Sequence, residues 1–190
     1  MKKVALYLIP LGLFLGLIVF LYQGLFSDPR DHKSSLLEQS MPEFVLPDLM
    51  NIEKTYTQDV FLGKVTLLNV WGVWCITCAI ELPYLKQLQN EGKIIVGLYY
   101  DQDIDPDFGV KTVQRVQQEV TQKLSKLGNP YDYNIFDVKR NLSLDLGVTG
   151  APETYLIDQQ GKIRLHHIGD INPRVWNNKF APIYDLLVAQ

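Results

Sequence analysis

The chain has 190 residues, of which 47% are hydrophobic and 21% are charged, a composition typical of a packed globular domain and not of a disordered chain. Its 18 lysines and arginines stand against 21 aspartates and glutamates, which gives a formal net charge of −3 at pH 7. This balance lacks the basic footprint that nucleic-acid binding requires, so nucleic acid is excluded as a partner.

The N-terminal segment contains a run of 19 residues without a charged side chain, residues 4–22. As a helix, this run is roughly 28 Å long, close to the thickness of a bilayer's hydrocarbon core. Pro10 is compatible with it, since proline is tolerated in membrane helices. Lys2 and Lys3 favour a cytoplasmic N-terminus, which places the rest of the chain outside the membrane. We therefore predict one transmembrane anchor within residues 1–26.

Two other interpretations of this segment stay open. A cleaved signal peptide has a shorter apolar stretch and a small-x-small cleavage site, whereas residues 23–29 read QGLFSDP. A buried helix of a soluble protein usually keeps a polar face, and no face of this run is polar. Without Lys2 and Lys3, 16 basic residues remain against 21 acidic ones, a net charge of −5 for the part predicted to lie outside.

Residues 27–40 are mostly polar and are predicted to form a linker, followed by a folded domain over residues 41–190. Early in that domain, two runs rich in β-branched and aromatic residues lack polar alternation, which predicts central strands buried on both faces. Helical patterns follow each run, and glycines mark where they stop. The predicted elements are strands at 64–71 and 93–100, a helix at 78–89 before Gly92, and a helix at 113–127 before Gly128.

The C-terminal third is predicted to contain three short strands and a last helix. The strands cover 133–137, 154–158 and 163–168, the last two joined as a hairpin, and the helix covers 174–189 with Pro173 at its start. This order of elements predicts an α/β fold in which a mixed sheet carries helices on both faces.

An acidic stretch at Asp101–Gly109 superficially resembles a calcium loop. The EF-hand pattern fails, because Pro106 occupies the position of its glycine and Thr112 that of its last glutamate. A solvated acidic loop is the better interpretation.

The two cysteines of the chain, Cys75 and Cys78, form a C-x-x-C pair directly after a predicted buried strand and at the start of a predicted helix. Unpaired backbone N–H groups and the helix dipole at that position stabilise a thiolate, which is the nucleophilic form of cysteine. Cys75 is therefore predicted to attack a partner's disulfide, and Cys78 to resolve the resulting mixed disulfide. The redox-active disulfide Cys75–Cys78 takes the place of a cofactor, and none is expected.

Other interpretations of the cysteine pair have less support from the sequence. A structural bridge over so short a loop constrains the unfolded chain little. A zinc site lacks further cysteines, and His166 and His167 are adjacent on a predicted strand, so they point to opposite faces. Copper binding by the two thiolates stays open.

These motifs resemble a known family. The segment LLNVWGVWCITC around the cysteines and GAPETYLID (residues 150–158) are similar to the active site and the cis-proline segment of the thioredoxin fold. Together with GNPY, LDLGVTG and HHIGDINPRVW, they resemble the DsbE/CcmG family, the membrane-anchored thiol:disulfide interchange proteins of cytochrome c maturation. The resemblance runs from about Pro42 to the C-terminus.

The resemblance implies roles for residues around the pair. Pro152 would be the cis-proline that faces the cysteines, where the backbone can add an extended substrate strand. Trp74, Ile76 and Thr77 would complete the substrate-binding surface, with Trp74 as a partly exposed lid. Ile76 departs from the proline usual in this family, which removes a preorganised helical residue.

Two acidic residues complete the predicted catalytic set. The family places Glu81 and Glu153 around its active site, where a carboxylate can carry protons during exchange. Asn69 stands where thioredoxin has a buried acid, and an amide cannot carry that proton, so we hypothesise that Glu81 or Glu153 does. The alternative is that each glutamate lies solvated on the surface.

As a function, the resemblance implies reduction of apocytochrome c cysteines before haem attachment. The thioredoxin-like domain would lie in the periplasm on a single-pass anchor in a bacterial inner membrane. Its partners would be apocytochrome c, or another maturation protein, and a membrane electron donor of the DsbD/CcdA type. The alternatives are a general exported reductase or oxidase, and a non-catalytic module that binds apocytochrome or copper.

Overall fold

The computed structural model describes residues 2–25, 36–101 and 111–189 of the chain. The chain divides into two compact units, Met1–His32 and Lys33–Gln190. Apart from Asp101, the predicted acidic loop lies outside the described residues.

The first unit contains one long helix, α1, which spans Lys2–Leu25 and includes Pro10. The helix predicted at this end of the chain is therefore present. A search of the described residues for a helix with the length and hydropathy needed to cross a membrane finds none.

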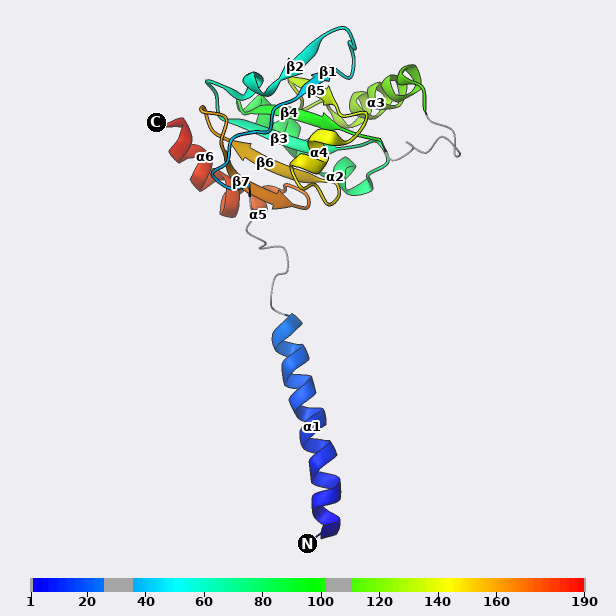
Figure 1. The fold of residues 1–190 in the computed structure, drawn as a ribbon, viewed down its shortest axis with the longest axis vertical. Coiled ribbons are helices and arrows are strands. Elements are labelled where there is room, and N and C mark those ends of the chain that lie inside the picture. Colours follow the sequence, from blue (N-terminus) through cyan, green and yellow to red (C-terminus); the bar gives the residue numbers. More distant parts are fainter. Residues whose placement is uncertain (1, 26–35, 102–110, 190) are drawn as a thin grey trace. The chain divides into compact units, whose positions relative to one another are not determined.

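The second unit is built on a five-stranded mixed sheet in the order β5-β4-β3-β6-β7 (Figure 1). β3 lies at its centre, parallel to β4 and antiparallel to β6, while β5 is parallel to β4 and β7 antiparallel to β6. The strands span Thr66–Trp71 (β3), Ile94–Tyr99 (β4), Tyr133–Phe136 (β5), Glu153–Ile157 (β6) and Ile163–Ile168 (β7). All five predicted strands are present, and the mixed sheet is confirmed.

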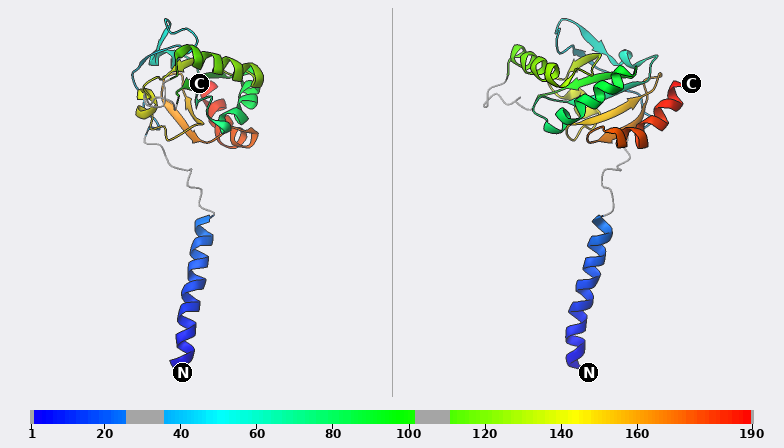
Figure 2. Two further views of the ribbon diagram at one scale, coloured as in Figure 1. Left: turned by 90° about the vertical axis from the view of Figure 1, so that its right-hand side faces the viewer. Right: turned by 180° about the vertical axis from the view of Figure 1, so that it is seen from behind.

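Helices cover both faces of the sheet, but unequally (Figures 1 and 2). One face packs against α2 (Ile76–Asn90), α3 (Val113–Leu127) and the C-terminal helical segments, through buried side chains such as Trp71 and Leu85. The other face packs against the short helix α4 (Asn141–Asp145), a 3₁₀ turn η1 (Gln58–Phe61) and the N-terminal part of the domain, around Leu68 and Val70. The side chains of alternate β3 residues thus pack into two separate hydrophobic cores, as expected for a strand buried on both sides.

Besides η1, three further elements escape the sequence prediction because they are short. β1 (Val45–Pro47) and β2 (Thr55–Thr57) pair as a small antiparallel ribbon, and α4 has five residues. None is long enough to show a hydrophobic period.

The described part of the domain begins before residue 41. Leu36 and Leu37 pack against the core beside η1, the backbone N–H of Glu38 donates to the carbonyl of Ile163 at 2.8 Å, and Ile163 N–H donates to the carbonyl of Gln39 at 2.9 Å. Residues 36–40, assigned from their polarity to the linker, thus contact the β7 strand.

The helix boundaries follow capping chemistry. Thr112 caps α3 through a hydrogen bond from Arg115 N–H, and Gly128 ends it with a φ of 91°, a conformation that favours glycine. The predicted last helix is present in three segments, α5 (Pro173–Val175), the π-helical η3 (Trp176–Phe180) and α6 (Ala181–Val188). Pro182 lacks the N–H that a regular helix needs at this point, which accounts for the wider turn before it.

Candidate active site

Cys75 and Cys78 form a disulfide at the N-terminus of α2, with their Cα atoms 5.3 Å apart. Cys75 is the N-cap residue, and its Sγ accepts a hydrogen bond from Cys78 N–H at 3.0 Å. The helix begins at Ile76, two residues earlier than predicted. The first sulfur therefore lies where unpaired N–H groups and the helix dipole favour negative charge, as the sequence predicts.

The two sulfurs differ in their surroundings. Cys78, in the first turn of α2, is fully buried. Cys75 is 5% exposed, and its Sγ lies 3.4 Å from the carbonyl oxygen of Ala151. The Ala151–Pro152 peptide bond is cis, as the resemblance implies. The structure thus brings the cis-proline segment directly against the first cysteine.

The predicted substrate-binding residues lie on the open side of the pair. Ile76 is 81% exposed and Thr77 is also exposed, while Pro152 is buried. Trp74 is half-buried, and its Nε1–H donates to the carbonyl of Tyr100 at 3.0 Å while its ring packs against the Tyr100 ring. Ile76 thus presents an apolar side chain to solvent next to the disulfide.

Glu81 is buried, only 1% exposed, one helical turn beyond Cys78 on the same face of α2. Its Oε1 accepts a hydrogen bond from Asn69 Nδ2 at 3.0 Å, and its Oε2 accepts one from Ile171 N–H at 2.9 Å. The alternative of a solvated surface glutamate is therefore wrong for this residue.

Asn69 connects Glu81 to two further hydroxyl groups. Its Nδ2 also donates to Thr154 Oγ1 at 3.0 Å, and its Oδ1 accepts a hydrogen bond from Tyr131 OH at 2.7 Å. All polar atoms of the Asn69 side chain are thereby used, which fixes the orientation of the amide. Asn69 replaces the buried acid of thioredoxin with a donor that holds an acid from the neighbouring helix.

The pKa of Glu81 is raised to about 8, mainly because burial penalises the charged carboxylate. The hydrogen bonds from Ile171 and Asn69 oppose this rise, and the nearby charge of Asp170 adds to it. A carboxyl group with a pKa near 8 is present in both its neutral and its ionised form near neutral pH, so it can take up and release a proton there.

Glu153 is also fully buried, but on the other face of the sheet. Adjacent residues of β6 alternate, so Thr154 contacts Asn69 on the Glu81 side, while Glu153 contacts His166 and Tyr155. Its Oε1 accepts from Thr149 N–H, Thr149 Oγ1–H and Gly150 N–H at 2.7–3.0 Å. Here too the surface alternative is wrong, and Glu153 braces the segment that leads to Pro152.

The pKa of Glu153 is lowered, although burial alone would raise it. The hydrogen bonds from His166, Thr149 and Gly150 outweigh the desolvation. A carboxylate held ionised by these donors is poorly suited to take and release protons at neutral pH. Of the two predicted proton carriers, the electrostatics favour Glu81.

Four residues of these networks were missed by the sequence prediction of the site: Tyr131, Thr149, Thr154 and His166. Tyr131 and Thr149 lie within the motifs GNPY and LDLGVTG on which the family resemblance depends. The motifs therefore point to these two residues, but the sequence does not show what they contact. His166 and His167 do point to opposite faces, as predicted, with the His166 ring stacked on Tyr155 and the His167 ring edge-on to Phe180.

Comparison with known proteins matches residues 37–181 to the Redoxin family. The Pseudomonas aeruginosa protein named thiol:disulfide interchange protein DsbE is 40% identical over 99% of this chain and 97% of its own length. The Escherichia coli K12 protein of the same name is 41% identical over 97% of this chain and 96% of its own length. The chain belongs to the DsbE family.

Solved structures agree with the fold of this DsbE-family chain. A candidate thiol:disulfide interchange protein DsbE from Chlorobium tepidum is similar with a TM-score of 0.59 and 24% identity, covering 80% of this chain and 96% of that one. A thio-disulfide isomerase from Thermus thermophilus is similar with a TM-score of 0.55 and 19% identity, covering 80% and 96%. The thioredoxin-like fold is confirmed.

The DsbE-family membership and the C-x-x-C pair together make this protein a thiol-disulfide oxidoreductase. The two cysteines lie within one helical turn, where they can form and open the disulfide.

Proposed function

We propose that the protein reduces the cysteines of apocytochrome c before haem is attached. The observation that carries this proposal is the disulfide at the start of α2, with Cys75 against the cis-proline segment and Cys78 beside a buried Glu81. The relatives named DsbE and the motifs shared with the cytochrome c maturation branch support the choice of substrate.

In the proposed reaction, the reduced pair supplies two electrons. The Cys75 thiolate attacks one sulfur of the substrate disulfide, forming a mixed disulfide and releasing the other substrate sulfur as a thiolate. Cys78 then loses its proton and attacks Cys75 Sγ, which releases the second substrate thiolate and leaves the Cys75–Cys78 bridge present in the structure. The Cys78 proton and one proton from solvent, which replaces the proton lost when Cys75 ionised, end on the two substrate thiols.

Glu81 is the group we assign to the Cys78 proton. It lies one turn from Cys78 on the same helix face, with its pKa raised to about 8. Its carboxylate can accept the Cys78 proton as the sulfur becomes a nucleophile, and the neutral acid can return a proton in the reverse step. Glu153 keeps the role of bracing the cis-proline segment.

The proposed location is the outer face of a bacterial inner membrane, with residues 1–26 as the anchor and a membrane electron donor that reduces the pair again. This part depends on the charge-free run at residues 4–22 and on Lys2 and Lys3, together with the family resemblance. Carbonate extraction of membranes tests it: the full chain is expected in the pellet, and release into the supernatant would contradict an anchor.

A trapping experiment tests the substrate. In the full-length Cys78→Ser variant, the mixed disulfide through Cys75 cannot be resolved, so partners accumulate covalently and can be identified by mass spectrometry. Cytochrome precursors are expected among them, and the Cys75→Ser/Cys78→Ser double variant is the control that should trap nothing. A broad set of exported proteins without cytochrome precursors would indicate a general reductase and overturn the proposal.

A further inference from the structure

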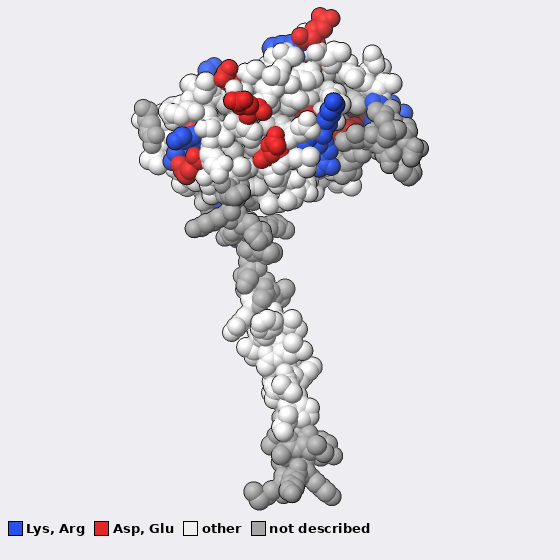
Figure 3. Space-filling view, in the orientation of Figure 1, with Lys and Arg blue, Asp and Glu red and all other residues white. Residues whose placement is uncertain are grey.

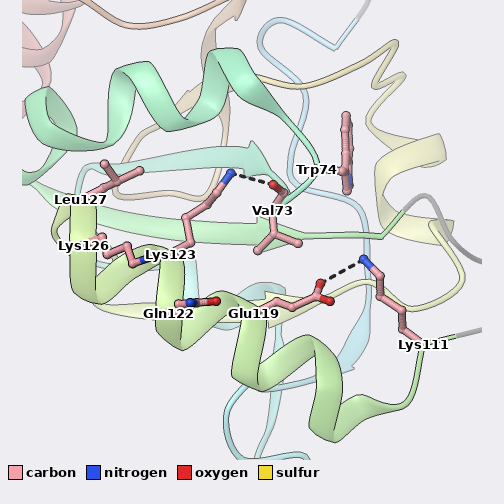
Figure 4. Close-up of a pocket in the computed structure, with 8 residues that line it drawn as sticks. All are labelled: Val73, Trp74, Lys111, Glu119, Gln122, Lys123, Lys126 and Leu127. Atoms are coloured by element: carbon pink, nitrogen blue, oxygen red, sulfur yellow. Dashed lines mark hydrogen bonds and ion pairs between the residues drawn. The ribbon is translucent and has the colours of Figure 1, made fainter.

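A groove of about 420 Å³ lies beside the cysteine pair, between α3 and the segment that leads into Cys75 (Figure 4). Its walls come from both elements: Val73, Trp74, Lys111, Glu119, Gln122, Lys123, Lys126 and Leu127. Because Trp74 immediately precedes Cys75, anything bound in the groove lies next to the residues that receive a substrate disulfide.

The charges of the groove are unbalanced. Its walls carry three lysines and one glutamate, but Lys111 also forms an ion pair with Asp101 at 3.5 Å, so the excess positive charge comes from Lys123 and Lys126. Figure 3 shows acidic and basic side chains interspersed over the face of the domain that it presents.

The one glutamate of the groove is already engaged. Glu119 forms ion pairs with Lys111 at 3.0 Å and with Arg115 at 3.1 Å. Lys123 and Lys126 contact no carboxylate among the described residues. The Nζ of Lys123 donates to the carbonyl oxygen of Val73 at 2.6 Å, which leaves two of its three N–H donors for another group.

Burial lowers the pKa of Lys123, because its charge is partly removed from water without an opposing charge nearby. A carboxylate placed in the groove would supply that charge. Val73, Trp74 and Leu127 contribute apolar atoms to the lining of the groove, which suits the aliphatic part of an extended peptide.

We propose that this groove binds an acidic, extended segment of the polypeptide with which the cysteine pair exchanges disulfides, through Lys123 and Lys126. The occupant is a polypeptide because the enzyme acts on protein thiols and the groove adjoins the reactive bridge. Binding Lys123 also acts on the active-site loop, since the same ammonium holds the Val73 carbonyl two residues before Cys75. The inference depends on thiol-disulfide exchange and holds whichever protein is the partner.

The test uses the reduced full-length protein and two disulfide-bonded peptides that differ only in carrying glutamate or glutamine beside the cysteine. We expect the KM for the glutamate peptide to be about tenfold lower at low salt, with a similar kcat, because ionic contacts act on binding more than on the chemical step. Raising the salt concentration to about 0.5 M should reduce this preference.

The Lys123→Gln/Lys126→Gln variant should lose the preference, so that the glutamate and glutamine peptides have equal KM values. Lys126→Glu changes an exposed residue of α3 and should weaken binding of the glutamate peptide further. Lys162→Gln removes an exposed lysine at the β6–β7 turn and is the matched control, expected to behave as the wild type.

Equal KM values for the two peptides in the wild type, or a preference that survives in the double variant, would overturn the proposal. The glutamine peptide reports exchange by itself, so this test stands whether or not the trapping experiment recovers cytochrome precursors.

Discussion

Two buried glutamates on opposite faces of one sheet behave in opposite ways. Both have almost no exposed surface, and burial alone would raise the pKa of each. Glu153 receives hydrogen bonds from His166 and from the Thr149–Gly150 segment, and its pKa is lowered. Glu81 receives one hydrogen bond on each oxygen, and its pKa rises to about 8.

The difference shows that burial does not by itself make a glutamate a proton carrier. The number and charge of the donors decide whether the carboxylate keeps its charge when it leaves water. In this protein the donors around Glu153 favour its ionised form, whereas Glu81 can exchange its proton near neutral pH.

Removing the anion should have the largest effect on stability. Glu153→Ala leaves several buried donors without an acceptor, so we expect the free energy of unfolding to fall by about 3–5 kcal/mol. Urea denaturation of the oxidised protein measures this. Glu153→Gln keeps one oxygen for Thr149 and Gly150, so its free energy of unfolding should fall clearly less. A fall below about 1 kcal/mol for the alanine variant would contradict the view that Glu153 is a structural anion.

The two glutamates should also give stability opposite dependences on pH. The folded pKa of Glu81 is above its unfolded value near 4.5, so the folded state binds more protons and stability falls as the pH rises from about 4.5 to 8. The slope from this one group is at most about 1.4 kcal/mol per pH unit. Glu153 has a lowered folded pKa, so its contribution is present above the unfolded value and is lost as the pH falls.

The Glu81→Gln variant separates the contribution of Glu81 to the pH dependence of stability from that of Glu153. Denaturation curves across pH 3 to 9 should show a flatter decline between pH 4.5 and 8 in this variant than in the wild type, because the group that must lose its proton is gone. The loss of stability below pH 4.5, where Glu153 acts, should be unchanged. An unaltered slope between pH 4.5 and 8 would mean that Glu81 titrates near its ordinary pKa.

The smallest effect is expected at Tyr131. Tyr131→Phe removes the hydrogen bond to Asn69 Oδ1 and leaves the stacking of the ring on Trp71 in place. We expect a loss of about 1 kcal/mol in the free energy of unfolding. Tyr133→Phe, whose hydroxyl contacts the Val60 carbonyl only at 3.5 Å, is the matched control and should lose less.

The sequence predicts those parts of the fold that repeat locally. β3 and β4 follow from continuous apolar runs and α3 from its apolar period, and Gly128 ends α3 where expected. The ribbon of β1 and β2 and the helix α4 are too short for any period, and residues 36–40 look like a linker because their pairing with β7 leaves no trace in composition.

The active site divides in the same way. The C-x-x-C pair and its place at a helix N-terminus follow from spacing, and the cis bond at Pro152 follows from the family resemblance. The surroundings of Glu81 could not be predicted, because they join residues far apart in the chain: Tyr131 lies 62 positions from Asn69, and Ile171 lies 90 positions from Glu81. Such contacts depend on the assembled fold.

The protonation of the two glutamates can be followed directly by ¹³C NMR of the full-length protein labelled at the glutamate side-chain carboxyl carbon, with Glu81→Gln and Glu153→Gln used to assign the signals. We predict that the Glu81 signal titrates with a midpoint near pH 8 and the Glu153 signal below pH 4.5. A Glu81 midpoint at or below that of Glu153 would contradict the assignment of Glu81 as the proton carrier of the cysteine pair.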